Sequence, residues 1–109
     1  MLWEAHVRGV ELDEGVRDHI ERRLTFALSR FEVRLLKVTV HLTDNNGPKG
    51  GIDKSCLIVA RLRGVEDVVV EVVDSDCVVA IDQATSRIGH TIGRALERRR
   101  DFTREPVQG

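Results

Sequence analysis

Aromatic side chains are scarce in this sequence: they make up 4% of its 109 residues, and tyrosine is absent. A core must therefore be filled mainly by valine, leucine and isoleucine, and the β-branched members of this set favour a fold that contains a sheet. Because 41% of the residues are hydrophobic, the chain can build a core, and its length suits a single domain.

Long apolar runs and cysteines are lacking as well. No stretch approaches the roughly 18 apolar residues that a membrane span needs, and residues 1–6 lack the basic-then-apolar order of a signal peptide. The two cysteines, Cys56 and Cys77, are too few for a disulfide framework. We expect both to be reduced and at least partly buried, in a soluble cytoplasmic protein without a membrane partner.

A basic surplus, which is typical of nucleic-acid binding, is also missing, because the formal net charge is −1. The charges are nevertheless unevenly distributed. Residues 17–63 hold ten Lys and Arg against five acids, residues 64–82 hold six acids and no base, and residues 83–104 hold six Arg against two acids. Local fields steer a charged partner, so the total does not exclude a local nucleic-acid site.

Hydrophobic spacing predicts six secondary-structure elements. Inward and outward residues alternate in three segments, which predicts strands over residues 3–8, 36–42 and 56–63, and a fourth strand is predicted over residues 68–73, which are valines interrupted by Glu71. Two further segments have apolar residues at helical spacing. The first begins after Asp13, a predicted N-cap, and runs to Phe31; the second follows acidic residues 74–76 and runs to about Arg100.

In the second strand, the alternation predicts that Leu36, Val38, Val40 and Leu42 share the buried face. In the fourth strand, Glu71 is expected to point outward.

The order of these elements is β-α-β-β-β-α. The first strand and helix predict a right-handed crossover to a parallel neighbour, and the short later loops predict an antiparallel meander. We therefore expect an α+β fold, a two-layer sandwich in which two parallel helices cover one face of a four-stranded mixed sheet. The domain is expected over residues 1–102, with residues 103–109 as a flexible C-terminal tail.

On the first helix, His19, Arg23, Phe26 and Arg30 follow one another at spacings of four, three and four, and Arg22 lies just outside this row. A basic stripe with one exposed ring suits contacts to phosphate together with stacking on a base or sugar. The same pattern also describes a solvated face whose phenylalanine is partly covered by a neighbour. The helix alone does not decide between these interpretations.

On the second helix, Arg87, Arg94 and Arg98 share one flank, and arginine binds phosphate in bidentate fashion. Cations in a last turn also complement the helix dipole, which is an ordinary explanation for Arg98 but not for the other two. Gly89 and Gly93 lie on another flank, and each costs about 0.5–1 kcal/mol relative to alanine. The favoured explanation for two glycines in this helix is close approach of the first helix. The alternative explanation is close approach of an RNA backbone.

The segment of residues 44–53 is rich in turn formers, so it either closes a hairpin or presents backbone N–H groups to a phosphate. Lys49 within it and Lys54 directly after it are added to the candidate RNA contacts. A likeness to a P-loop fails, because Asp53 stands where glycine is needed and a strand follows instead of a helix.

Catalytic and metal-binding patterns are not found. The four histidines and two cysteines lack metal-ligand spacing, and no nucleophile motif is present. We therefore expect no catalytic residue, no metal, no cofactor and no small-molecule substrate, and expect that the protein is not an enzyme.

Several segments occur in the order found in a known family. They are Leu-Asp-Glu-Gly-Val-Arg at residues 12–17, Val-Thr-Val-His-Leu at 38–42 and above all Ala-Ile-Asp-Gln-Ala at 80–84, while residues 44–56 are similar to a loop of one bacterial branch. Together with the order of elements, they resemble the ribosome hibernation-promoting factor family, also called ribosome-associated inhibitor A or the sigma-54 modulation proteins. The resemblance covers about residues 5–100.

The resemblance implies binding to the small ribosomal subunit in its decoding region, where the family overlaps the sites of messenger and transfer RNA, silences translation and protects idle ribosomes. The basic helix residues of the family carry over onto Arg22, Arg23, Arg30, Arg87, Arg94 and Arg98.

Two departures from the family stand out. Val78 stands where many members have tyrosine, and the sequence ends before the C-terminal dimerising domain of long members, which implies a short form without that domain. The alternative function is a protein-interaction module that docks through acidic residues 64–82 or through a sheet edge.

Overall fold

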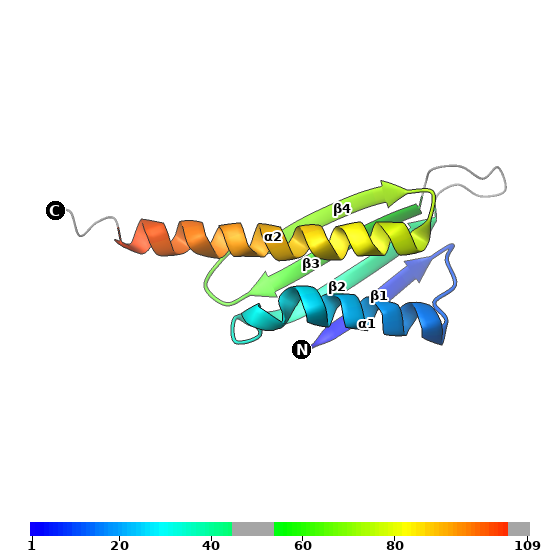
Figure 1. Ribbon diagram of the computed structural model, residues 1–109, viewed down its shortest axis with the longest axis horizontal. Coiled ribbons are helices and arrows are strands. Elements are labelled where there is room, and N and C mark those ends of the chain that lie inside the picture. The colour runs from blue at the N-terminus through cyan, green and yellow to red at the C-terminus, as the bar shows by residue number, and fades with distance from the viewer. Residues whose placement is uncertain (45–53, 105–109) are drawn as a thin grey trace.

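A computed structural model describes residues 1–44 and 54–104, with side chains as far as residue 99. Its elements are β1 (Trp3–Arg8), α1 (Glu14–Leu28), the 3-10 turn η1 (Ser29–Phe31), β2 (Leu35–Asp44), β3 (Lys54–Leu62), β4 (Val68–Asp74) and α2 (Cys77–Arg104). The sheet has the order β1-β2-β3-β4, in which β1 is parallel to β2 and the other pairs are antiparallel. Both helices cover the same face of the sheet and run in the same direction (Figure 1). The predicted α+β sandwich is confirmed.

Both helices begin at aspartates, as predicted. The Asp13 carboxylate accepts a hydrogen bond from the backbone N–H of Val16 at 2.8 Å, and the Asp76 carboxylate accepts one from Val78 at 2.8 Å. Asp74 supports the second cap, because its carboxylate accepts from the backbone N–H of Asp76 at 2.9 Å. These bonds satisfy N–H groups that have no partner inside a helix.

The predicted end of α2 near Arg100 is four residues short, since the helix continues to Arg104. The sequence contains no helix breaker before Pro106, and only the residue directly before a proline is disfavoured in a helix. Residues 105–109 of the predicted tail lie outside the described residues, so the domain boundary stays a prediction. Although α2 is long, no helix in the described part of the chain is apolar enough to cross a membrane.

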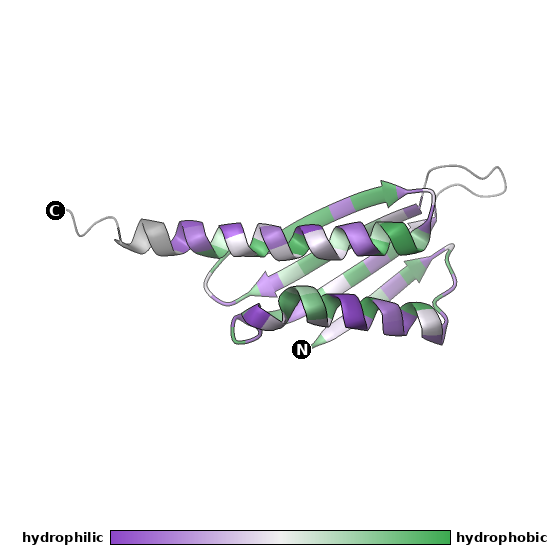
Figure 2. Ribbon diagram, viewed as in Figure 1, coloured by the Kyte–Doolittle hydropathy of each residue, from purple (hydrophilic) through white to green (hydrophobic). Residues whose placement is uncertain are grey.

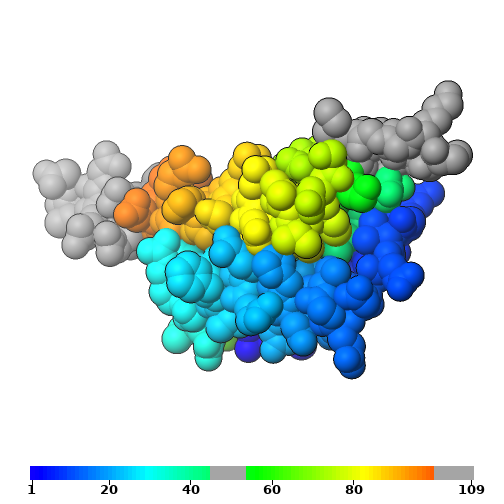
Figure 3. Space-filling view, turned by 45° about the vertical axis from the view of Figure 1, so that its right-hand side comes forward, coloured from blue at the N-terminus to red at the C-terminus, as the bar shows by residue number. Residues whose placement is uncertain are grey.

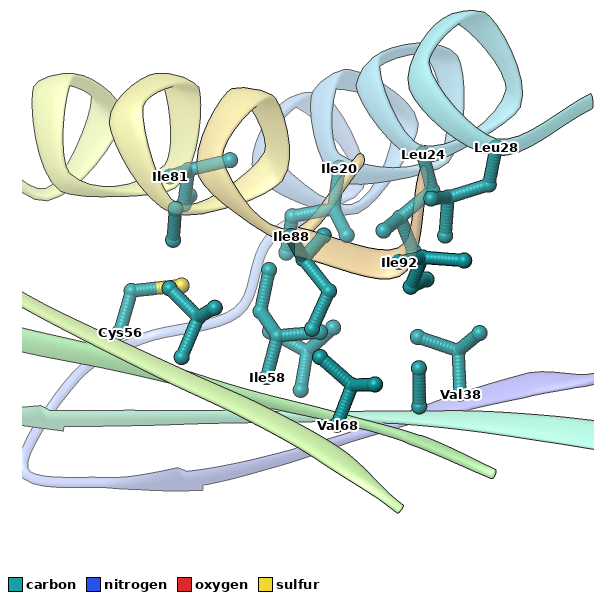
Figure 4. Close-up of a cluster of buried hydrophobic side chains, with 14 of the residues drawn as sticks. Ile20, Leu24, Leu28, Val38, Cys56, Ile58, Val68, Ile81, Ile88 and Ile92 are labelled. Atoms are coloured by element: carbon teal, nitrogen blue, oxygen red, sulfur yellow. The ribbon is translucent and has the colours of Figure 1, made fainter. Parts of the chain in front are cut away.

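The core lies between the two helices and the sheet, and hydrophilic residues occupy the outward sides of the helices (Figure 2). The spacing predicted for the helices and the alternation predicted for β3 are confirmed, and Glu71 of β4 is exposed as predicted. Figure 4 shows the helix side chains pointing toward those of the sheet. The labelled members are Ile20, Leu24 and Leu28 of α1, Ile81, Ile88 and Ile92 of α2, and Val38, Cys56, Ile58 and Val68 of the sheet.

One inward-facing assignment was wrong. The register between β2 and β3 shifts between Leu35 and Lys37. This irregularity leaves Leu36 42% exposed, and Leu35 packs against the core in its place. An extra residue in one strand reverses the alternation on one side of it. Because Leu35 and Leu36 are adjacent, the sequence alone does not show which of the two faces inward.

The two helices lie side by side across one face of the molecule (Figure 3), and glycine lets them approach. A Cβ atom on Gly89 would lie 3.1 Å from the carbonyl oxygen of Ala27, and one on Gly93 would lie 3.2 Å from Nη2 of Arg30. Both neighbours belong to the α1–η1 segment. Close approach of the first helix, the favoured explanation for the two glycines, therefore accounts for Gly89, whereas Gly93 meets only side-chain atoms.

Both cysteines are free, and Cys56 is buried while Cys77 is partly buried, as predicted. Burial raises the pKa of the Cys56 thiol to about 12, and the neighbouring Cys77 adds to the rise. Burial and then the Asp76 carboxylate raise the pKa of Cys77. The two residues are therefore neighbours, one at the sheet and one at the start of α2.

We expect the thiols of the folded protein to react slowly with a disulfide reagent at pH 8, because the thiolate is the reactive form and burial disfavours it. In a Cys77→Ser variant, the remaining Cys56 should react only as fast as the protein unfolds, and at full rate in urea. Absorbance at 412 nm follows the reaction with dithionitrobenzoate. Reaction of Cys56 in native buffer at the rate measured in urea would show that its burial is wrong.

Candidate nucleic-acid interface

The basic flank of α1 faces α2. Arg23, Phe26 and Arg30 lie on this flank, and together with residues of α2 they line a hollow of about 220 Å³. The α2 residues of this hollow are Ser86, Gly89 and His90. Helical spacing had placed the α1 residues in one row, but it contained no information about which neighbour the row faces.

Two larger hollows adjoin this one. One, of about 720 Å³, lies toward the C-terminal ends of both helices, and the other, of about 420 Å³, lies on the outer side of α2. The smallest hollow shares Arg30 with the large one and shares Ser86 and His90 with the outer one, and the large and outer hollows share Arg94, so the three lie next to one another, although the outer one is lined by α2 residues alone. We call the three hollows together the interhelix groove. Its basic and hydroxyl-bearing lining residues are Arg23, Arg30, Arg34, Ser86, Arg87, His90, Arg94 and Arg99.

Asp82 connects the two helices at one end of the groove. Its Oδ1 lies 2.6 Å from Nε2 of His19 and 3.3 Å from Nε of Arg23, and its carbonyl oxygen accepts a bond of 3.5 Å from Nη2 of Arg23. Nε of Arg23 is shielded from solvent and lacks hydrogen-bond geometry, so its contact with Asp82 is an ion pair only. Two members of the predicted α1 stripe, His19 and Arg23, thus bind α2. Because the Arg23 guanidinium is paired with Asp82, its positive charge is partly compensated and attracts a ligand less strongly.

Arg87 and Arg94 are exposed on α2, and neither side chain has a hydrogen-bond or ion-pair partner among the described residues. Arg30 stacks over the ring of Phe31 at 4.5 Å, which orients the guanidinium and leaves its N–H groups at the groove. These three guanidinium groups are the cations of the groove best able to bind a new anion. Glu97 is an acid at the edge of the large hollow.

The remaining predicted contacts lie elsewhere. Arg22 is exposed on α1 but lines none of the three hollows, and Arg98 lines a separate hollow of about 390 Å³ together with Glu66 and Asp67. Nζ of Lys54 lies 3.6 Å from the Asp44 carboxylate, at the far ends of β2 and β3. Lys49 lies outside the described residues.

Four basic or hydroxyl-bearing residues of the groove were not identified as contacts from the sequence: Arg34, Ser86, His90 and Arg99. Arg34 follows η1, and its Nε and Nη2 donate to the carbonyl oxygen of Arg63 at 3.3 and 3.1 Å. This contact fixes the guanidinium at the lining of the large hollow. Arg34 is outside both helices, so no periodic pattern includes it. Ser86 and His90 lie four residues apart on α2. They become part of a candidate site only because α1 packs beside them.

The chemistry that this groove supports is anion binding by several oriented guanidinium groups, with a hydroxyl and an imidazole beside them. In the part of the chain that the structure describes, no group of three or more His, Cys, Asp or Glu side chains is placed to hold a metal ion.

Comparisons with known proteins identify the fold and the family of the chain. The chain has a TM-score of 0.71 with the N-terminal domain of protein Y from Thermus thermophilus, at 25% identity over 86% of this chain and 98% of that one. A ribosomal subunit interface protein from Coxiella burnetii has the same fold, with a TM-score of 0.71 at 13% identity over 86% of this chain and 96% of that one. Among curated proteins no significant match is found. The family profile described as sigma 54 modulation protein / S30EA ribosomal protein matches residues 4–100, and the chain therefore belongs to that family.

Proposed function

We propose that this protein is a cytoplasmic translation inactivation factor that binds the RNA of the small ribosomal subunit in the decoding region. The observation that carries the proposal is a set of three arginines, Arg30, Arg87 and Arg94, that line adjoining hollows between the helices and on the outer side of α2 and have no ion-pair partner among the described residues. Phosphate is the anion that ribosomal RNA presents in a closely spaced row, and arginine is suited to binding it. Binding there would block the sites of messenger and transfer RNA.

The names of the similar structures support this choice of partner. One of them is a ribosomal subunit interface protein, and the family description includes a ribosomal protein. The local charge resolves the difficulty posed by a net charge of −1. Asp74 and Asp76 are engaged in the cap of α2, and Asp82, which lines the same hollow as Arg87 and Arg94, is paired with His19 and Arg23. The groove therefore holds two acids, Asp82 and Glu97, against six arginines and presents mainly positive charge.

The alternative, docking of a partner protein through acidic residues 64–82, loses support from the structure. Asp74 and Asp76 cap α2, Asp82 pairs with residues of α1, and Glu71 accepts a bond from the Ser55 hydroxyl at 3.1 Å. Four of the six acids are thus engaged within the fold and do not form one free acidic surface.

Sedimentation of the purified protein with isolated small and large ribosomal subunits tests the proposal. We expect co-sedimentation with the small subunit at low salt, and a steep loss as salt rises, because each phosphate contact releases counterions. The same gradients with an in vitro translation assay should show inhibition at the protein concentrations that saturate the small subunit. If the protein stays at the top of the gradient at low salt, or binds equally at all salt concentrations, the proposal is wrong.

A further inference from the structure

Phe26 is the most exposed large hydrophobic side chain described, at 83% of its surface. Phe26 is not part of the hydrophobic core; the phenylalanine that packs in the core at this end of α1 is Phe31. Leaving a phenylalanine in water forgoes about 1.5–3 kcal/mol of burial free energy. In a sequence with so few aromatics, such a position calls for an explanation outside the folded domain itself.

The surroundings of Phe26 are polar and cationic. The ring lies on α1, with Arg23 one turn before it and Arg30 after it in η1, and all three line the hollow of about 220 Å³. Across the hollow are Ser86 and His90, both exposed and without a hydrogen-bond partner among the described residues. An exposed ring thus lies beside guanidinium, hydroxyl and imidazole groups, of which those of Arg30, Ser86 and His90 have no hydrogen-bond or ion-pair partner among the described residues.

This combination matches the chemistry of one nucleotide. A base offers a flat face to an aromatic ring and polar atoms at its edge, and its phosphate offers charge to arginine. In a double helix the faces of the bases are hidden by stacking, so only an unpaired, unstacked nucleotide can use the ring. An acidic peptide would use the arginines but would gain little from Phe26.

We propose that Phe26 and the hollow beside it form a site for a single unstacked nucleotide of an RNA strand. The base stacks on the Phe26 ring, its edge reaches Ser86 and His90, and the adjoining phosphates lie on Arg30 and Arg94. This inference rests on the proposed function and deepens it: the protein selects single-stranded or looped RNA over duplex. The arginines supply general attraction, and the ring supplies the selection.

The test compares a single-stranded RNA of about eight nucleotides, within the usual range of site sizes, with a duplex of the same sequence, by fluorescence anisotropy at low salt. Phe26→Ala should weaken binding of the single strand roughly 5- to 150-fold and leave duplex binding unchanged. Phe26→Trp should restore the affinity, and in a Trp3→Phe background its fluorescence should be quenched by the single strand. Phe26 is exposed on a helix, so thermal unfolding of Phe26→Ala should match that of the wild type.

Val33→Ala is the matched control, because Val33 is 82% exposed but lines none of the described hollows of the groove. It should leave binding of both RNAs unchanged. Equal losses for single strand and duplex in Phe26→Ala, or no loss at all, would overturn the nucleotide site. So would binding of polyglutamate as tightly as the single strand, since this would assign the groove to an acidic protein.

Failure of this inference can be told apart from failure of the proposed function. If wild-type protein sediments with small subunits while Phe26→Ala binds the single strand normally, the function stands and the nucleotide site is wrong. If the wild type does not sediment with ribosomes but its binding to the single strand depends on Phe26, the site stands and the ribosomal partner is wrong.

Discussion

The variant Arg87→Glu/Arg94→Glu should lose affinity for the small ribosomal subunit by at least about 100-fold at low salt. Hydrogen bonds to charged groups contribute about 1.5–3 kcal/mol each, and the two new carboxylates would repel phosphate. The fold should survive, because both side chains are exposed and have no partner among the described residues. Gradient sedimentation measures the loss, and circular dichroism checks that the helices remain.

The salt dependence of the same variant is a second measure of the same contacts. Its plot of log affinity against log salt should be shallower than that of the wild type by roughly 1.4 to 1.8, as expected for two lost phosphate contacts. An unchanged slope would mean that neither arginine contacts a phosphate, whatever the change in affinity.

The matched control is Arg8→Glu/Arg61→Glu, which changes the net charge by the same amount. Both residues are exposed on strands, outside the interhelix groove. We expect it to bind small subunits within a few-fold of the wild type. A loss equal to that of the α2 variant would show that binding follows total charge, and the groove would no longer be the site.

Substitutions at the two helix glycines should change stability in opposite directions. Gly89→Val should lower the free energy of unfolding by about 1–3 kcal/mol, because the added atoms meet the backbone carbonyl of Ala27, which can move only with α1. Gly93→Ala should raise it by about 0.5–1 kcal/mol, because the added methyl meets the end of the flexible Arg30 side chain and the helix gains propensity. Urea unfolding followed by circular dichroism measures both.

The same pair of variants also tests the geometry of the groove. Since α1 and α2 form its two sides, a displaced α1 in Gly89→Val should weaken RNA binding even where the protein remains folded. Gly93→Ala should retain binding within a few-fold. A stable Gly89→Val protein with unchanged unfolding free energy would show that the helices do not approach as closely as the structure has them.

Local patterns in the sequence determined much of the fold. Alternation identified the inward residues of β3, the one acid of the valine run in β4 marked an outward position, and aspartates at the helix starts identified both caps. These features depend on residues within a few positions of one another, and such interactions are encoded directly in the order of the side chains. The β2 bulge is the exception, because it is defined by pairing with β3 rather than by β2 itself.

The candidate site was only partly visible in the sequence. Helical spacing gave the row that holds Arg23, Phe26 and Arg30, and the flank that holds Arg87 and Arg94. Spacing fixes angles around one helix axis and leaves the rotation of that helix against its neighbour undetermined.

Tertiary packing supplied what spacing could not. It turned His19 and Arg23 toward Asp82, brought Arg34 to the groove and set Arg98 apart beside Glu66. The sequence by itself therefore determined which residues are charged and on which flank of its helix each one lies. The tertiary structure alone decided which of them meet, because the close approach of α1 to Gly89 sets the separation and rotation of the two helices.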